Sequence, residues 1–457
     1  MKHHLLSGRR RRARSLAAIV VAVGALSGCD ALLDVENPQA IQGAQLSDRF
    51  YLNLLTNGVV SDFQRMFDDV AFFGGVFTDE LRNHATFQEE PLIDQRDVSS
   101  GNGTAGNLVY AQLQRARGLA DSTALRFRTL RGDSANADLR LARVLAYGGM
   151  TYVLMGETLC EIPVDLSAPF TPEQILRDFA LPRFEEAIAV ATAARAQAPA
   201  LPNISTAERA RIVAGADSII NLSRVGAARA ALDLNDRARA IQFASQVPAA
   251  FLFVSYYSET ATELNNFVWS RLTQTASASV SGTPFEALRG QDPRVPIPTT
   301  TETAVGGLRV YIPNSPTAYT TYSGTLPGAE FSQGANIRIA SGLEARYIVA
   351  EAEGVNAANI AFVNGRRAIG GLAPLPSGTT SAAYYMELRD QRRRDLYLDA
   401  HRLGDLRRYR TQYGDIEDIN EFQQGSFYGS SILSFADQYC FPVNSSELAG
   451  NPFYKNR

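Results

Sequence analysis

Histidine, cysteine and tryptophan are scarce in this chain of 457 residues, which contains four, three and one of them. Two histidines stand among the first four residues, so His84 and His401 are the only others. A histidine-built zinc site needs several ligands close together, and a Ser-His-Asp triad needs a histidine beside its serine. The sequence has few residues for either. We therefore expect no catalytic residue, no metal site and no cofactor.

The N-terminus has the layout of a bacterial lipoprotein signal. Lys2 and five arginines within residues 9–14 form a basic region, residues 16–26 are apolar, and small residues lead to Cys29. An apolar run of about eleven residues is too short to span a bilayer, which needs roughly twenty. We predict cleavage before Cys29 and fatty acylation of its thiol, with palmitate for example, as a membrane tether. The alternative is an ordinary signal peptide with an incidental cysteine.

Lysine is nearly absent, since Lys2 and Lys455 are the only two. Removal of residues 1–28 takes away six of the 44 basic residues and no acidic one, which leaves 38 against 47 and a net charge of −9. This excess of acid argues against nucleic-acid binding, which requires a basic face, and against electrostatic adhesion to anionic lipid. Arginine suits fixed ion-pair networks, but a GC-rich coding sequence produces the same bias. We favour the second explanation.

Beyond Cys29 the chain has two cysteines, Cys160 and Cys440. An exported protein meets oxidising conditions, which favour a disulfide between them. The bond would close a loop of about 280 residues, for which the chain-entropy relation gives roughly 5 kcal/mol as an upper bound. Two buried thiols are the alternative.

Apolar residues recur at helical spacing along most of the chain, which predicts a mostly α fold with a few short strands. After the signal (1–28) and a tether (29–40), we expect one domain over 41–457. It has a helical scaffold at 41–248 and 341–410, a loop-rich region at 249–340 and an irregular tail at 411–457. The predicted helices include 41–56, 61–73, 107–128, 134–156, one that begins at Thr171, two within 205–247, and 341–354, 357–370 and 381–402.

The segment 205–247 predicts two helices joined by a turn at Asn235-Asp236. The second helix is marked by Ala238, Ile241 and Ala244, and small alanines at such positions allow the two helices to pack closely. Residues 227–248 are similar to the second half of a tetratricopeptide unit. The scaffold is therefore expected to consist of tetratricopeptide-like helix pairs, although alanine-rich helix pairs are common.

Residues 101–106 match the pattern GxGxxG, which binds dinucleotides when a buried strand precedes it. The preceding residues 94–100 are polar and charged, so we interpret the segment as a loop. The charged segment 391–410 places Arg392, Asp395, Asp399 and Arg402 on one face of a helix. Because flanking arginines lower a carboxyl pKa, we predict a structural ion-pair ladder there and not a pair of catalytic acids.

Aromatic residues cluster in the loop-rich region. Most are expected to pack in the core or in loops. Trp269, Tyr311, Tyr319 and Tyr322 are candidates for an exposed platform, because a flat ring stacks on the apolar face of a sugar while its polar edge stays wet.

Five separated segments share the motifs of one known family. Residues 139–165 resemble an Ala- and Tyr-rich helix that ends in a stretched form of a "G-D-V-P" turn. Asp292-Pro293-Arg294 resembles a "D-P-R" element. Residues 342–375 resemble two helices with the patterns "R-x-A-E-x-x-L-x-x-AEA" and "N-x-x-R". Residues 392–408 match "ER-x-x-EL-x-x-EGHR-x-x-DLRR", and residues 441–452 match a closing "F-P-I-P-x-x-E-x-x-x-N-P". The chain thus resembles the SusD/RagB family of nutrient-uptake lipoproteins. The chain departs from the family pattern at four positions. Asp395 and Asp399 stand where the family has glutamate, Ala400 where it has glycine, and Asn444 where it has proline.

The resemblance implies a helical protein whose loop-rich region carries the ligand surface. It also implies a partner, a SusC-like TonB-dependent outer-membrane transporter that the lipoprotein caps, and ligands that are often glycans. The matched motifs are fold motifs, so no binding residue is carried over from them.

We expect a non-enzymatic lipoprotein, anchored at the outer-membrane surface, that captures an oligomeric nutrient, with a glycan as the expected ligand. One alternative is a helical-repeat scaffold without a ligand cleft. The other is an exported glycoside hydrolase, for which the adjacent pairs Asp68-Asp69 and Glu89-Glu90 are poorly arranged, since neighbours on a helix do not face each other.

Overall fold

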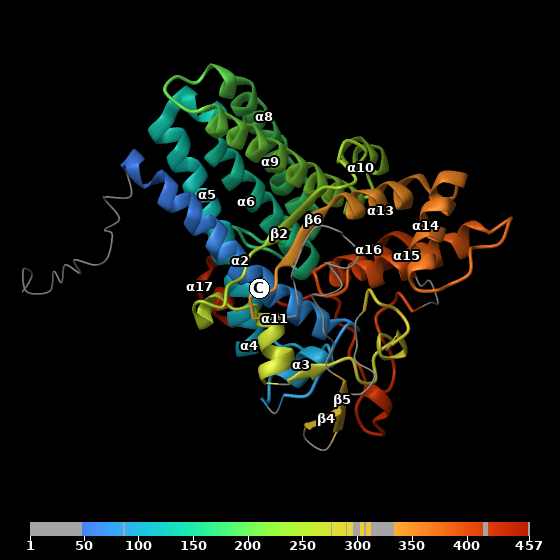
Figure 1. Cartoon of the computed structure of the whole chain (residues 1–457). Coiled ribbons are helices and arrows are strands. Elements are labelled where there is room, and N and C mark those ends of the chain that lie inside the picture. Colours follow the sequence, from blue (N-terminus) through green and yellow to red (C-terminus); the bar gives the residue numbers. More distant parts are fainter. Residues whose placement is uncertain are drawn as a thin grey trace, which may run out of the picture. The chain divides into compact units, whose positions relative to one another are not determined.

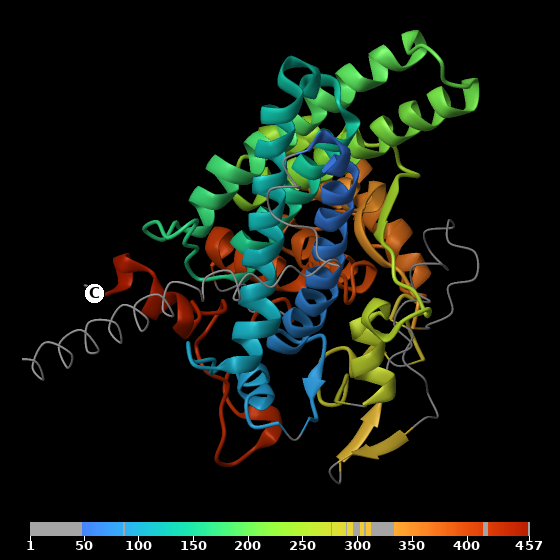
Figure 2. The same ribbon diagram turned by 90° about the vertical axis from the view of Figure 1, so that its left-hand side faces the viewer.

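Six helices of the scaffold form a row in which each helix, in chain order, contacts the next (Figure 1). Figure 2 shows the same row after a 90° turn. Stacking of this kind buries the apolar stripe of each helix against its neighbours, as the predicted helix pairs require. The six are α2 (Leu52–Phe77), α5 (Ala111–Arg131), α6 (Leu139–Thr158), α8 (Leu181–Gln197), α9 (Thr206–Asp233) and α10 (Arg237–Ala244).

The computed structural model describes residues 48–85, 87–275, 277–288, 290–295, 302–305, 308–311, 333–414 and 419–455, with the backbone alone at 302–305 and 308–311. The signal, Cys29 and the tether lie outside these ranges. From Leu52 onward the chain forms one compact unit, and a single turn at Arg49–Tyr51 precedes it.

The first long helix differs from its prediction. Instead of two short helices at 41–56 and 61–73, α2 runs unbroken from Leu52 to Phe77. The helix continues through Gly58 because Leu55, Val59 and Phe63 are buried at helical spacing on both sides of it. A glycine costs a helix only about 1 kcal/mol, which this burial outweighs.

Close packing of the scaffold depends on two glycines beside one phenylalanine. A Cβ at Gly149 of α6 would lie 2.7 Å from Cε1 of Phe184, and a Cβ at Gly226 of α9 would lie 2.2 Å from its Cζ. The ring of Phe184 on α8 therefore fits only against helices without side chains at these two positions. This local shape explains why α6, α8 and α9 all contact one another.

Helix starts follow the sequence closely. Thr171 caps α7 (Pro172–Ile175) through a capping box with Gln174, and Asp236 caps α10. The glycine-rich segment also holds a cap: Asn102 accepts a hydrogen bond from the N–H of Ala105 at the start of α4 (Gly103–Ala105). No strand lies within residues 95–102, all of which are described. The segment is a loop that starts a helix, as predicted.

The loop-rich region contains short elements, as expected. One antiparallel pairing joins β2 (Leu252–Ser255) to β6 (Ile337–Ser341). Two further two-stranded pairs join distant or neighbouring segments, and short helices fill the spaces between them. Within the region, β4 (Glu302–Val305) pairs with β5 (Leu308–Tyr311), and α11 (Phe267–Trp269) is a short helix. The remaining strand, β3 (Ala278–Ser279), pairs with β1 (Arg82–Asn83) from the scaffold segment, where the short helix α3 (Glu90–Asp94) also lies.

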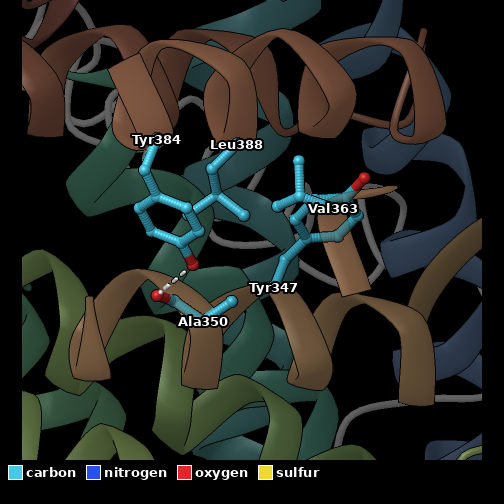
Figure 3. Packing of buried hydrophobic residues seen from close by; sticks show 5 residues of the cluster. All are labelled: Tyr347, Ala350, Val363, Tyr384 and Leu388. Carbon is cyan, nitrogen blue, oxygen red and sulfur yellow. Dashed lines mark hydrogen bonds between the residues drawn. The ribbon is translucent and has the colours of Figure 1, made fainter. Parts of the chain in front are cut away.

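Three C-terminal helices begin within one residue of their predicted starts: α13 (Gly342–Glu353), α14 (Ala357–Ile369) and α15 (Ser381–Asp395). Two more, α16 (Arg402–Tyr413) and α17 (Ser445–Gly450), were not predicted. A buried cluster joins the first three and includes Tyr347, Val363 and Leu388 (Figure 3). Within it the hydroxyl of Tyr384 donates to the carbonyl oxygen of Ala350 at 2.9 Å. Burial of these side chains fixes α15 over α13.

The prediction of an ion-pair ladder on one helix face is wrong, because the segment does not form one continuous helix. Helix α15 ends at Asp395, and α16 begins only at Arg402. Between them Leu398 and Ala400 have φ values of 57° and 62°, which lie in the left-handed region and break the helix. The backbone N–H of Leu398 donates to Oε1 of Glu80 at 2.8 Å, so tertiary contact overrides the local helical pattern.

The four charged side chains of the predicted ladder are all buried and all ion-paired, but each pairs with a residue from a different segment. The pairs are Arg392 with Asp405 (2.8 Å), Asp395 with Arg366 (2.7 Å), Asp399 with Arg338 (2.8 Å) and Arg402 with Asp79 (2.7 Å). The segment therefore connects β6, α14, α16 and the residues that follow α2. All four residues are thus ion-paired, but with other segments and not along one helix face; their purely structural role stays a prediction.

His401 lies at the centre of this network. Its Nδ1 is 2.6 Å from Oδ1 of Asp399, and its Nε2 is 3.0 Å from Oε1 of Glu344. Burial and the nearby Arg229 oppose a positive charge on the ring, but the carboxylates of Asp399 and Glu344 outweigh both and raise the pKa of His401 to about 9. His401 is therefore a cation at neutral pH.

The pH dependence of stability tests this assignment. Because folding raises the pKa of His401 from 6.5 to about 9, protonation of this residue stabilises the folded state by about 3 kcal/mol. This contribution to the unfolding free energy is complete below pH 6.5 and is lost as the pH rises through 9. We expect the difference in unfolding free energy between wild type and His401→Gln to shrink over pH 6.5–9, measured by denaturant unfolding. His84→Gln is the control, because burial and Arg82 lower the pKa of His84 to about 4, so that it stays neutral throughout. A constant difference across this range would contradict the charged imidazolium.

Cys160 and Cys440 form a disulfide that joins the end of α6 to the C-terminal segment. Backbone hydrogen bonds flank it: the N–H of Cys160 donates to the carbonyl of Phe441 at 3.0 Å, and the N–H of Phe441 donates to that of Thr158 at 2.8 Å. The ring of Phe441 packs on Phe77 at 4.6 Å. The tail is thus bound to two scaffold helices.

Loss of the disulfide should destabilise the protein. In the double variant Cys160→Ser/Cys440→Ser we expect the unfolding free energy to fall by up to roughly 5 kcal/mol, because the unfolded chain regains the freedom of a long loop. Denaturant unfolding with and without reductant measures this, and reductant should not affect the double variant. Two free thiols in the unreduced, denatured mature protein would contradict the bond.

Candidate ligand-binding site

A cleft of 400 Å³ separates α2 from the segment that follows β2. The helix α11, which contributes Phe267 to the cleft, contacts α2 (Figure 1). The lining of the cleft comes from both the helical scaffold and the loop-rich region. Its lining residues from the scaffold are Ser61, Asp62, Gln64, Arg65, Asp68, Asp69, Leu108 and Arg115. Those from the loop-rich region are Tyr256, Tyr257, Thr262, Glu263, Leu264, Asn265 and Phe267.

Tyr256 is the exposed aromatic residue of this cleft, with 67 % of its surface accessible. Its backbone is fixed, because Nε2 of Gln64 donates to its carbonyl oxygen at 3.1 Å. The hydroxyl of Tyr257 donates to the carbonyl of Gln64 at 3.0 Å, which binds the same segment to α2 a second time. No ring of the described residues stacks on Tyr256. Because the backbone of Tyr256 is fixed and its ring is exposed, the ring can stack on a flat apolar surface of a ligand.

Asp68 and Asp69 supply buried carboxyl groups to the scaffold wall. Oδ2 of Asp68 accepts a hydrogen bond from the N–H of Phe267 at 2.8 Å, which positions the opposite wall. Burial, together with the charge of Asp69, raises the pKa of Asp68 well above its ordinary value. Burial also raises the pKa of Asp69 to about 7, although Arg65 and Arg271 oppose this. Carboxyl groups with shifted pKa values in a cleft are typical of functional sites.

Around these groups the cleft combines charged and apolar surface. Arg115 and Asp62 form a bidentate pair at 2.9 Å for both bonds. Phe267, on the wall opposite α2, adds apolar surface, and its ring packs edge-on against Phe72 at 5.6 Å. Charged groups beside apolar surface can bind a hydroxyl-rich molecule that also has apolar faces.

The aromatic platform predicted from the sequence is not brought together by the described residues. Trp269 is half-buried in α11, two residues after Phe267, and does not line the cleft. Tyr311 lies in β5, where the backbone alone is described, and Tyr319 and Tyr322 lie outside the described residues. The role predicted for these four residues stays a prediction.

Sequence reasoning did not select Tyr256, Asp68 or Asp69 for the site. A signal for the carboxyl pair was present, since Met66-Phe67 precede it and Val70-Ala71 follow it in a helix. Acidic residues inside an apolar helical run are expected to be buried and to have raised pKa values. Tyr256 carried no such signal, because its exposure depends on how the loop lies over α2.

Among the residues that the structure describes, no three His, Cys, Asp or Glu side chains group in a way that could hold a metal ion. Within the same residues, no helix combines the length and apolar character needed to cross a bilayer.

Comparison with known proteins identifies the fold. No protein-family model and no curated protein matches the chain. Solved structures do match: a SusD superfamily protein from Parabacteroides distasonis has 15 % identity and a TM-score of 0.61, and covers 89 % of this chain and 98 % of its own. A SusD-like carbohydrate binding protein from Bacteroides vulgatus has 11 % identity, a TM-score of 0.60 and the same coverage of both chains. Surface glycan-binding protein A from Bacteroides uniformis has 12 % identity and a TM-score of 0.54, and covers 88 % and 98 %.

These identities are low, so the matches concern the fold. The chain has the SusD-like fold over nearly nine-tenths of its length, which confirms the mostly helical architecture and the resemblance stated from its motifs.

Proposed function

We propose that this chain is a glycan-binding lipoprotein of the outer-membrane surface. It would hold an oligomeric nutrient in the Tyr256 cleft and deliver it to a SusC-like TonB-dependent transporter. The observation that carries the proposal is the free ring of Tyr256 beside buried carboxyl groups, in a cleft at the edge of a SusD-like scaffold. Sugars present apolar faces and many hydroxyl groups, which such a cleft complements. Two structures of the same fold carry carbohydrate- or glycan-binding descriptions, which supports the ligand class.

A glycan array followed by titration of the best binder tests the ligand site. We expect Tyr256→Ala to weaken binding about 30-fold, since truncation of a central aromatic contact costs roughly 2 kcal/mol. Trp269→Ala is the matched control, because Trp269 is a neighbouring aromatic outside the cleft. Equal binding by wild type and Tyr256→Ala would remove the cleft from the function. An effect confined to Trp269→Ala would favour the platform predicted from the sequence.

The proposal excludes catalysis by the cleft. Asp68 and Asp69 are adjacent on one helix, so their side chains diverge and do not flank a substrate from two sides, as glycoside hydrolysis requires. Cleavage of the bound glycan by purified protein, abolished in Asp69→Asn, would favour the hydrolase alternative instead. A pure scaffold without ligand is disfavoured by the 400 Å³ cleft beside an exposed aromatic ring.

The anchor and the partner rest on the signal at Cys29 and on the fold. In protein extracted gently from membranes we expect an acyl mass on Cys29 and a co-purifying TonB-dependent transporter. Cys29→Ser should release the protein into the soluble fraction, because a thioether-linked lipid can no longer form. Ser27→Ala, which keeps a small residue before the cysteine, should stay with the membrane. Wild-type protein that is soluble and has an unmodified thiol would contradict the anchor.

A further inference from the structure

Strand β2 leads from the Tyr256 cleft to a second cavity of 250 Å³, beside the first turn of α13. The walls of this cavity are largely apolar, with Phe251, Leu252, Leu343 and Phe362 among them. One side is closed by tight backbone packing, since a Cβ at Gly342 would lie 2.3 Å from the carbonyl oxygen of Pro248. The cavity is thus a shaped feature of the fold.

Three guanidinium groups from three different elements line this apolar cavity: Arg338 of β6, Arg346 of α13 and Arg366 of α14. Two of them have carboxylate partners, because Arg338 pairs with Asp399 at 2.8 Å and Arg366 pairs with Asp395 at 2.7 Å. Their charges are balanced inside the protein and mainly shape the wall.

Arg346 differs from the other two. It donates to neutral acceptors, Oδ1 of Asn359 at 2.7 Å and the carbonyl of Ala358 at 3.2 Å, and its guanidinium lies 4.6 Å from the ring centre of Phe362. Its Nη1 is buried and has no hydrogen-bond partner, and none of the described carboxylates forms an ion pair with it. A half-buried cation that has no counter-ion among the described residues is unfavourable beside apolar walls. The first turn of α13 adds positive potential.

We propose that this cavity binds a monocarboxylate with a flat apolar body. The carboxylate pairs with the guanidinium of Arg346, the arginine of this cavity that has no ion pair among the described residues. The body lies against Phe251 and Phe362, which offer no hydrogen bonds. The same walls disfavour inorganic anions, whose hydration the cavity cannot replace. The site is separate from the Tyr256 cleft, so it does not rest on glycan binding.

Calorimetric titration with benzoate tests the proposal, and benzamide serves as the uncharged probe of the same shape. We expect saturable binding of one benzoate per chain and no measurable binding of benzamide. Arg346→Gln should weaken benzoate binding about tenfold or more, because it removes a charge-assisted hydrogen bond. Arg346→Lys keeps the charge without the planar fork and should fall between the two.

Arg209→Gln is the matched control, since Arg209 is also half-buried, donates to a backbone carbonyl (Leu201, 2.8 Å) and has an unpartnered Nε. It should bind benzoate like wild type. Ala250→Phe fills the cavity mouth, leaves every arginine in place and should abolish binding. Tyr256→Ala should bind benzoate normally, which separates this site from the glycan cleft.

Three results would overturn the proposal: equal binding of benzoate and benzamide, equal losses in Arg346→Gln and Arg209→Gln, or displacement of benzoate by sulfate at similar concentration. The first two would remove the role of the Arg346 charge. The third would show an anion site that does not require an apolar body.

Discussion

The buried turn between α15 and α16, residues 396–401, is the constraint on which the rest of the structure depends. Its Asp399 accepts from Arg338 of β6 and His401, and the flanking Arg402 pairs with Asp79 just after α2. Charges removed from water cost several kcal/mol each, and only good partners offset this. The network therefore adds little net stability compared with apolar packing. It specifies one arrangement, because any other would leave buried charges unmatched.

Both walls of the candidate cleft are held in place by contacts with this turn. The scaffold wall is α2, whose C-terminal end is held by Asp79 with Arg402 and by Glu80, which accepts from the N–H of Leu398. The loop wall begins at the end of β2, which is paired with β6, and Arg338 of β6 binds Asp399. A shift of the turn would move Asp68 relative to Tyr256. The ligand surface thus relies on contacts far from it in sequence, as loops on a rigid scaffold generally do.

The sequence predicted those parts of the fold whose cause is local. The helical pair within 205–247, the Thr171 cap and the starts of α13, α14 and α15 depend on periodicity and capping, which are visible within a few residues. The break at Leu398 and Ala400 was missed, because its contacts are distant in sequence: Glu80 accepts from the N–H of Leu398, and Arg229 donates to the carbonyl oxygen of Ala400. The cleft was missed for the same reason. An aromatic cluster after residue 249 was visible, but only the packing of the loop on α2 selects Tyr256 as the exposed ring.

The near-exclusive use of arginine has a structural consequence that base composition alone does not explain. A biased coding sequence accounts for the number of arginines but not for their burial, and Arg96, Arg229, Arg294 and Arg392 are among the largest fully buried side chains. Arg229 binds both oxygens of Glu157, and Arg402 binds both oxygens of Asp79. Lysine offers a single point of charge and cannot form such planar pairs. Whatever produced the arginines, the fold now uses their geometry, so replacement by lysine would keep the net charge of the chain and still lose the contacts that hold its helices together.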